Sequence, residues 1–450
     1  MLKRVSIALL SLLLAALAYL WLAQDLSPAQ FTAGARLATG MGAKLACSSR
    51  HLSGFDQSTI EEDILTYSPL MAYLRYDYPA PGLVEADYIG SPTARARYRP
   101  GLGCTLEYGP NELDAVVVPD TTPLPGVEWP RGSAVRGTDP VVQTLLDEIL
   151  QADNAAGERT RALLVVKDGR VVAESYAPGI TAATPLLGWS MGKSITAILL
   201  GRLEALGLAD IAQSRLFPEW QGDERSAISM ENLLQMNSGL DFEEDYLPGS
   251  DSTRMLFMSP AASEVALASK LGHAPGSHFY YSSGTTNLLS RLVFQRTGNS
   301  LQQQVDFFHR EFVLPLGLQN TVLEPDSTGV VVGSSYVYAS ARDWARFGQL
   351  MLAGGKLNGR RLLSRDWVRR AVQPNGSANY PAYGYQFWLN SGDEPLWPSL
   401  PADAYAMLGN RKQVVMVVPG AQAVIVRLGW SSGEYPTDSN FLRILAALDG

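Results

Sequence analysis

The amino-acid sequence predicts an α/β (α+β) fold: an antiparallel sheet with flanking helices, and a helical lobe beside it. Two observations lead to this prediction. Strand-like runs occur over residues 161–176 and again over residues 413–428, and the segment from about 190 to 352 between them is mainly helical in pattern. Since strands from both ends of a chain can share one antiparallel sheet, the intervening helices should form a separate lobe, and a functional site would lie at the junction.

The N-terminal residues are typical of a membrane-targeting segment. Lys3 and Arg4 precede an apolar run over residues 5–22, which is just long enough to cross a bilayer, and positive charge ahead of such a run predicts export of the chain beyond it. A small-x-small site at residues 16–18 would permit cleavage, but the apolar run continues past it. We expect a signal anchor over residues 1–24, with a cleaved signal peptide as the alternative. The bulk of the chain would then be periplasmic and held at the inner membrane.

The rest of the chain divides into an N-terminal extension over residues 25–136 and a main domain over residues 137–450. The extension carries the two cysteines of the chain, Cys47 and Cys104. Export would make a disulfide between them plausible. Two unrelated buried thiols are the alternative.

The main domain begins and ends with strand signals. Two β-rich runs over residues 161–166 and 171–176 flank an Asp-Gly pair, which is a strong hairpin signal. A second pair of runs, over residues 413–418 and 423–428, flanks a Pro-Gly turn. These two hairpins are expected to supply the antiparallel sheet.

Helical signals occupy the middle of the chain and its end. Residues 194–206 are rich in Ala, Leu and Ile, and Gly207 is a plausible stop for that helix. Residues 340–343 resemble a capping box ahead of a segment with helical spacing. A last helix is expected over residues 438–448.

Composition excludes several function classes. Hydrophobic residues make up 46% of the chain and charged residues 18%, as in a globular protein with a sizeable core. The formal net charge of −8 offers no basic surface for a nucleic acid. The histidines share no metal-ligand spacing, so we expect no metal site; they are His51, His273, His278 and His309.

Residues 188–194 contain the strongest chemical signal, an S-x-x-K pair formed by Ser190 and Lys193. At the start of a helix, residues three apart lie on one face. A serine hydroxyl is a weak nucleophile until a base takes its proton, and a lysine can do so only if burial lowers its pKa. Lys193 is the only lysine of the chain with a serine three residues before it. The apolar residues 195–200 just after it indicate a buried helix start rather than a surface lysine.

Two other motifs compete for the same residues. A phosphate-binding loop would need a glycine where Leu187 stands, so the loop length is wrong. A nucleophile elbow, G-x-S-x-G, matches Gly188, Ser190 and Gly192. That motif requires a buried strand directly before it, and residues 181–187 contain a proline and make a poor strand. The S-x-x-K interpretation is therefore favoured.

Further motifs in the main domain resemble those of a known family. They are a Tyr-Ser pair after a Pro-Gly turn at residues 275–284, Asn-Ser-Gly-Leu at 237–240, and the run at 341–348. With the S-x-x-K pair, they make residues 137–450 resemble the serine β-lactamase and penicillin-binding-protein superfamily. The likeness is greatest to the branch of class C β-lactamases, related esterases and 6-aminohexanoate-dimer hydrolases.

This resemblance implies a β-lactamase-like fold and a serine hydrolase of amidase or esterase type that needs no cofactor. It places the family's catalytic tyrosine on Tyr281, with Tyr280 as the alternative. Ser190 would attack the carbonyl of a small amide or ester, Lys193 and Tyr281 would manage the protons, and water would release the acyl-enzyme. A nearby lysine would favour the phenolate form of the tyrosine.

Departures from the family pattern bear on the substrate. Ser283 stands where relatives often carry Asn, and the third motif, Lys-Thr-Gly in β-lactamases, is replaced by Gly-Asn-Arg-Lys-Gln at residues 409–413. The oxyanion of the intermediate should be held by the backbone N–H of Ser190 and by a second N–H, of Arg411 or Lys412, across the cleft. Asn410 would stand in place of the family's lysine or histidine. Without that charge, amides or esters are favoured over β-lactams.

Two alternatives remain open from the sequence. One is an acylation sensor or non-catalytic penicillin-binding-type protein, which would keep the serine but fail to deacylate; a true β-lactamase is less favoured. The acidic run at residues 241–245 is expected to be a solvated loop, although it would favour amine-bearing substrates if it bordered the site. His273 and His278 are expected to be structural.

Overall fold

The computed structural model describes residues 28–448, apart from residues 90, 110–111, 122–123 and 381. The signal anchor expected over residues 1–24 therefore lies outside the described residues. Among the residues that are described, none of the helices is both long and apolar enough to cross a membrane.

A six-stranded antiparallel sheet forms the centre of the main domain, with the strand order β12-β13-β14-β15-β5-β6. Both predicted hairpins are present, and β15 pairs with β5, so that the two ends of the domain share one sheet. The prediction of an α/β (α+β) fold built on such a sheet is confirmed. The strands are β5 (Thr160–Lys167), β6 (Arg170–Tyr176), β12 (Trp388–Leu389), β13 (Tyr405–Gly409), β14 (Gln413–Val418) and β15 (Ala423–Gly429).

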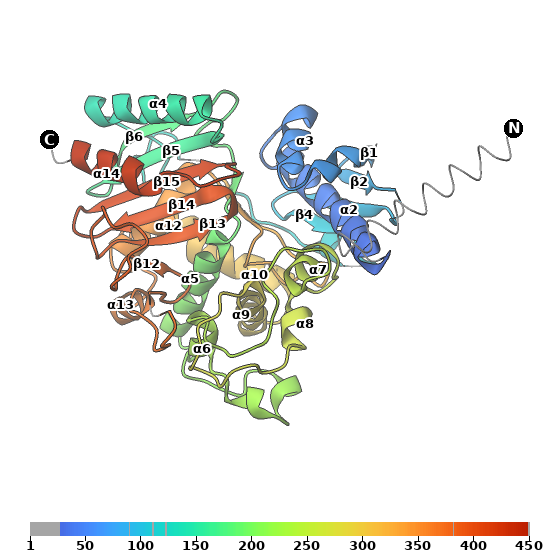
Figure 1. Ribbon diagram of the computed structural model, residues 1–450. Helices are drawn as coiled ribbons and strands as arrows, with labels where there is room; N and C mark the ends of the chain where they lie inside the picture. The colour runs from blue at the N-terminus through green and yellow to red at the C-terminus, as the bar shows by residue number, and fades with distance from the viewer. Residues whose placement is uncertain (1–27, 90, 110–111, 122–123, 381, 449–450) are drawn as a thin grey trace, which may run out of the picture.

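Both faces of this sheet are buried, because alternate residues along each strand point into different cores. In β5, Leu163 and Val165 face one apolar cluster and Leu164 and Val166 face the other. Helices α4 (Pro140–Ala155) and α14 (Thr437–Leu448) cover the outer face, and α12 (Ala341–Leu352) covers the inner face (Figure 1). Double burial explains why these strands read as almost continuous apolar runs.

The helical lobe lies below the sheet in Figure 1, and α5 (Met191–Ala205) runs between the two. The other α-helices between the hairpins are α6 (Met230–Leu234), α7 (Asp251–Phe257), α8 (Ala262–Leu267), α9 (Ser283–Arg296), α10 (Leu301–Phe308), α11 (Leu314–Leu316) and α13 (Arg365–Ala371). Shorter turns are η3 (Pro218–Trp220), η4 (Glu224–Ala227), the π-helix η5 (His309–Val313) and η6 (Asn410–Lys412).

A small second sheet supports the start of α5. It has the order β7-β9-β8, with strands Leu186–Leu187, Val337–Ala339 and Thr321–Leu323. The segment before Ser190 thus contains only a two-residue strand, and that strand is outside the main sheet. A two-stranded hairpin, β10 (Lys356–Leu357) and β11 (Arg360–Arg361), completes the domain.

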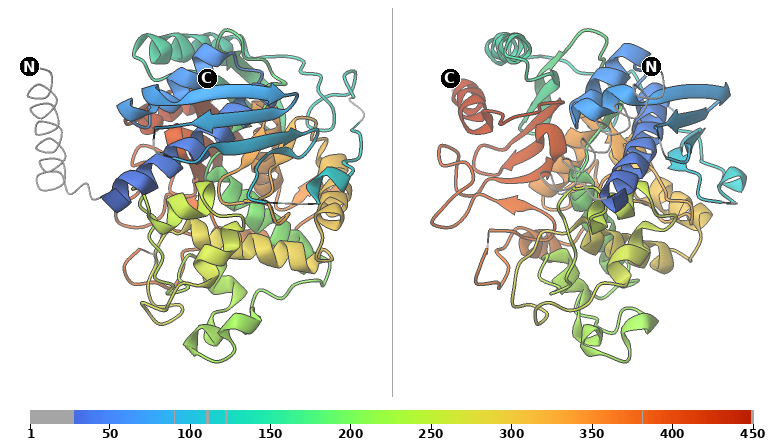
Figure 2. Two further views of the ribbon diagram at one scale, coloured as in Figure 1. Left: turned by 90° about the vertical axis from the view of Figure 1, so that its right-hand side faces the viewer. Right: turned by 45° about the vertical axis from the view of Figure 1, so that its right-hand side comes forward.

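The N-terminal extension packs against one side of the main domain (Figure 2). It consists of α2 (Pro28–His51), α3 (Gln57–Leu65), η1 (Pro69–Tyr73), η2 (Leu113–Ala115) and a four-stranded antiparallel sheet, β1 (Arg75–Ala80), β2 (Leu83–Asp87), β3 (Ala94–Arg99) and β4 (Gly103–Leu106). Cys47 on α2 and Cys104 on β4 form a disulfide bond, with 6.0 Å between the Cα atoms.

Several polar contacts hold the extension in place. Lys44 of α2 forms a buried ion pair with Glu324 of the main domain, and Asp63 of α3 pairs with Arg161 of β5 at 2.5 Å. Apolar residues of α2 and α3 belong to the same core cluster as those of α5. The extension and the main domain therefore share one core.

Candidate active site

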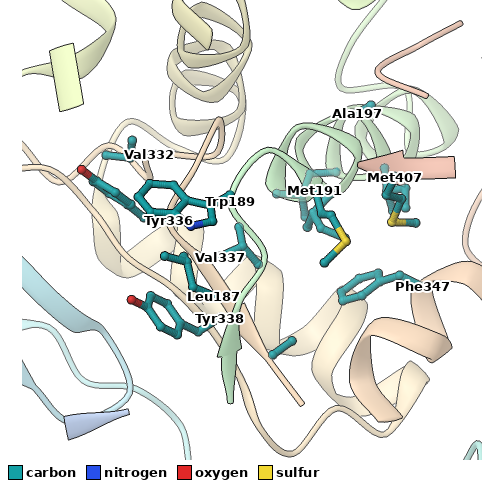
Figure 3. Packing of buried hydrophobic residues seen from close by; sticks show 14 of the residues in the cluster. Leu187, Trp189, Met191, Ala197, Val332, Tyr336, Val337, Tyr338, Phe347 and Met407 are labelled. Atoms are coloured by element: carbon teal, nitrogen blue, oxygen red, sulfur yellow. The ribbon is translucent and has the colours of Figure 1, made fainter. Parts of the chain in front are cut away.

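Ser190 stands at the N-terminus of α5, at the end of a tightly constrained turn. A Cβ atom on Gly188 would lie 2.2 Å from the ring of Trp344, so only glycine fits there. Trp189 adopts a left-handed backbone with φ of 48° and is buried beside Tyr336, while Met191 faces Met407 and Phe347 (Figure 3). Packing on both sides of the turn fixes Ser190 at the helix start, where backbone N–H groups lack intrahelical partners.

Lys193 lies one helical turn after Ser190, on the same face of α5. Its Nζ donates to Ser190 Oγ at 3.1 Å, to Ser283 Oγ at 2.8 Å and to the Ser334 carbonyl at 3.2 Å. The side chain is only 1% exposed. Burial lowers the pKa of Lys193 to about 8, against the opposing charge of Glu244. Roughly a tenth of the amine is then neutral at pH 7, so Lys193 can act as a base toward the Ser190 hydroxyl.

Glu244 lies behind Ser283, which separates it from Lys193. Its carboxylate accepts from the Ser283 N–H at 2.7 Å and from the Ser283 hydroxyl at 2.5 Å. Burial raises the pKa of Glu244, while the charge of Lys193 opposes that rise. The Ser283 hydroxyl thus links the Glu244 carboxylate to the Lys193 amine.

The expectation of a solvated acidic loop is wrong for Glu244, although Asp241, Glu243 and Asp245 are exposed. A signal was present in the sequence: Phe242, two residues earlier, is apolar and is buried. In extended chain, residues two apart point the same way, so an inward Phe242 predicts an inward Glu244.

Tyr281 lies beside Ser190 and Lys193, whereas Tyr280 is exposed. The Tyr281 ring centroid lies 4.8 Å from Lys193 Nζ, and its ring packs beside Trp388. Burial raises the pKa of Tyr281, and this effect outweighs a hydrogen bond with Ser190 that lowers it. The expected phenolate is therefore replaced by a protonated phenol, which can donate a proton but is a poor base.

The segment at residues 409–412 begins beside the nucleophile turn. A Cβ atom on Gly409 would lie 2.1 Å from the Gly188 carbonyl oxygen, so β13 touches that turn closely. The Arg411 N–H donates to Asn410 Oδ1 at 2.8 Å. Lys412 Nζ pairs with Glu434 at 2.8 Å at the surface. The Arg411 N–H and the Lys412 side chain are thus both engaged elsewhere than at Ser190.

Arg411 points toward the N-terminal extension. Its guanidinium lies 3.9 Å from the ring centroid of Tyr67, and the Tyr67 ring meets Trp189 and Trp430 edge-on at 6.3 and 6.1 Å. Tyr67 therefore contacts both Trp189, the residue before Ser190, and Arg411 of the third motif. No sequence signal pointed to Tyr67, because the contact depends on how the extension docks.

The two histidines near Tyr281 stack on each other. The ring centroids of His273 and His278 are 4.2 Å apart. In the described part of the chain, no cluster of three or more His, Cys, Asp or Glu side chains is arranged to hold a metal ion.

Comparisons with known proteins identify the family of the main domain. The family model described as Beta-lactamase matches residues 146–449. A 6-aminohexanoate-dimer hydrolase of Paenarthrobacter ureafaciens is 26% identical over 293 residues, which cover 60% of this chain and 72% of that protein. A D-aminopeptidase of Brucella anthropi is 26% identical over 179 residues, covering 37% of this chain and 33% of that protein.

A solved structure from Bacillus anthracis, provisionally named a 6-aminohexanoate-dimer hydrolase, superposes with a TM-score of 0.58. The sequences are 20% identical, and the match covers 75% of this chain and 90% of that one. The shared fold is that of the main domain predicted from the sequence.

Proposed function

The chain belongs to the serine β-lactamase and penicillin-binding-protein superfamily, and from this membership we propose that it cleaves an amide or ester bond through an acyl-enzyme on Ser190. At the level of the family, its relatives are serine hydrolases of amides and esters. One observation carries the proposal for this chain: a buried lysine with a lowered pKa donates to the Ser190 hydroxyl at 3.1 Å.

Acylation would begin with proton transfer from the nucleophile. The neutral Lys193 amine takes the proton of Ser190 as Oγ attacks the substrate carbonyl carbon, and the carbonyl oxygen becomes an oxyanion. We assign its donors to the Ser190 N–H and, across the cleft, to the Lys412 N–H, because the Arg411 N–H already donates to Asn410 Oδ1. The tetrahedral intermediate then collapses, and the bond to the leaving amine or alcohol breaks. Tyr281 protonates the leaving group and recovers its proton from the Lys193 ammonium.

Deacylation would reverse these roles. A water molecule replaces the leaving group, gives a proton to the same base system and attacks the acyl carbon. The acid product leaves, and Ser190 regains its hydroxyl proton. Glu244, linked through Ser283, would stabilise the ammonium form of Lys193 that both steps generate.

The substrate class is inferred from the third motif. Lys412 is paired with Glu434 and Arg411 is stacked on Tyr67, so neither cation is free to hold a substrate carboxylate. This arrangement supports amides or esters, which need not carry a carboxylate, over β-lactams, in keeping with the hydrolase and aminopeptidase names of the Paenarthrobacter and Brucella relatives. A true β-lactamase activity has the least support.

Pre-steady-state kinetics on the full-length protein tests the proposal. An activated ester should give a burst of one equivalent and then steady turnover, and a screen of amides, esters and β-lactams should find turnover in the first two classes. Ser190→Ala should abolish both phases. A burst with no turnover would instead identify an acylation sensor or non-catalytic penicillin-binding-type protein, and turnover that survives Ser190→Ala would reject the mechanism.

We also propose that the protein acts outside the cytoplasm, held at the inner membrane by residues 1–24. The Cys47–Cys104 disulfide supports an oxidising compartment. Fractionation should place the full-length chain in the inner membrane with the main domain accessible to periplasmic protease. A soluble chain would contradict the anchor, and protection from that protease would contradict the location.

A further inference from the structure

A cavity of about 320 Å³ lies between the extension and the helical lobe. Its walls come from the end of α2, from β3, β8 and α9, and from α10 with the π-helix that continues it. Its size falls at the lower end of the range for small-molecule pockets, roughly 300–1,000 Å³. It is therefore large enough to hold a small organic molecule.

The cavity is separate from the candidate active site. Its contact with α5 is through Leu199, nine residues beyond Ser190, which corresponds to roughly 13 Å along the helix axis. Ser190, Lys193 and Tyr281 do not line it. A molecule bound there would not be a substrate in position for Ser190.

The lining is mainly apolar and carries no acidic side chain, lysine or arginine among the described residues. Aliphatic and aromatic side chains from both the extension and the main domain dominate it. Burial and the charge of Arg50 lower the pKa of His51 at the extension wall, so this ring stays neutral at neutral pH. Because burying a charge without a partner is strongly unfavourable, this wall favours an uncharged ligand.

Two polar atoms in this wall have no hydrogen-bond partner among the described residues: Gln304 Oε1 and His309 Nε2. Gln304 is only 4% exposed, and its side chain is part of the cavity wall. By contrast, the Thr321 hydroxyl in the same wall already donates to Asp343 at 2.9 Å. Buried polar atoms are nearly always paired in native proteins, and two orphans on consecutive helical turns mark a place for a ligand's polar group.

We propose that this cavity is a binding site for an uncharged aliphatic molecule that carries a hydroxyl group. The chain of the ligand lies against the apolar wall that the extension and the helical lobe share. Its hydroxyl donates to Gln304 Oε1 and lies within reach of His309 Nε2. Because the extension forms one wall of the cavity and the main domain forms the other, the site exists only when the extension is docked.

Calorimetric titration of the full-length protein with 1-butanol, 1-hexanol and 1-octanol tests this site. We expect one equivalent of 1-octanol to bind, with affinity rising about fourfold for each added methylene. Octanoate and octylammonium should bind at least tenfold more weakly. Failure of 1-octanol to saturate, or equal binding of a charged analogue, would overturn the proposal.

Amino-acid substitutions test whether 1-octanol binds in this cavity. Val305→Trp should fill the cavity and abolish 1-octanol binding, with Val322→Phe as a second filling variant if the first does not fold. Val265→Trp, in α8 outside the cavity, is the matched control and should bind normally. Gln304→Leu should weaken 1-octanol about three- to tenfold. Ser190→Ala should bind 1-octanol unchanged, whereas loss of binding in that variant, or its persistence in both filling variants, would refute the site.

Discussion

Two buried lysines, Lys44 and Lys193, occupy the same protein core and do different things. Both are almost fully buried, at 2% and 1% exposure, and burial lowers the pKa of each. Lys44 touches a carboxylate directly, that of Glu324, and also donates to Ser48 at 3.1 Å. Lys193 donates to two hydroxyls and a carbonyl, and its nearest acid acts through Ser283.

The difference teaches that burial alone does not make a base. A carboxylate in direct contact holds Lys44 in one ion pair, which ties the extension to the main domain. Lys193 has no such direct contact, because the Ser283 hydroxyl lies between its amine and the Glu244 carboxylate. Its ammonium group can therefore lose a proton to solvent, and the neutral amine can then take a proton from Ser190. Identical substitutions at the two positions should therefore have opposite consequences.

The largest effect is expected from Lys193→Met. Without the base, kcat/KM on any active ester should fall by roughly 10⁴-fold, as when one member of a catalytic unit is removed. The free energy of unfolding should not fall, because the variant removes a buried amine that lacks a direct carboxylate partner. Steady-state kinetics together with urea unfolding measure both quantities. Activity within tenfold of the wild type would mean that Lys193 is not the base.

Tyr281→Phe should come next, with kcat reduced by about 10²- to 10³-fold, because general acids contribute roughly that much. The loss should be greater for amides than for activated esters, since an amine leaving group needs the proton more. Tyr280→Phe is the matched control: the ring is adjacent but exposed, and its activity should stay within about twofold of the wild type. Equal losses of kcat in the two variants would contradict the assignment of Tyr281 as the general acid.

Lys44→Met should be the converse of Lys193→Met. Leaving Glu324 buried without its partner should cost about 3–5 kcal/mol of unfolding free energy, while the folded fraction keeps its kcat. The double variant Lys44→Met/Glu324→Gln should recover part of that loss, because it also removes the orphaned charge. Chemical unfolding of the three variants measures the coupling. A Lys44→Met protein of full stability would contradict the stabilising role of the ion pair, and a stable but inactive one would mean that Lys44 is needed for activity.

The local parts of this molecule were predictable from the sequence, and so were three long-range features: the sheet shared by both ends of the main domain, the Cys47–Cys104 bond and the position of Tyr281 beside Lys193. The other long-range contacts were not. The hairpins, α5, and the pairing of Ser190 with Lys193 depend on residues a few positions apart. Glu244 reaches Ser283 across 39 residues, and Lys44 reaches Glu324 across 280. Contacts of that kind are decided by how the lobe and the extension pack, which periodicity and spacing do not encode.

The third motif illustrates the same limit. Its place at the end of β13 beside Gly188 is implied by chain order, but the direction of its side chains is not. Arg411 turns to Tyr67 because the extension places an aromatic ring there, and Lys412 turns to Glu434 at the surface. A short motif can thus be located correctly while its chemical role is set by a distant segment.

The smallest and sharpest test concerns the hydroxyl that separates acid from base. Activity requires neutral Lys193, so log kcat/KM should rise with pH and level off above about pH 8, the lowered pKa of that amine. The charge of Glu244 raises the pKa of Lys193. Glu244→Gln should therefore lower that pKa further and move the rising limb to lower pH, with little change in the plateau. Asp245→Asn, a charge-matched change on the exposed neighbour, should leave the profile in place. A limb that stays in place or moves to higher pH in Glu244→Gln would contradict the coupling of this carboxylate to Lys193, and loss of the limb would mean that the carboxylate itself governs the titration.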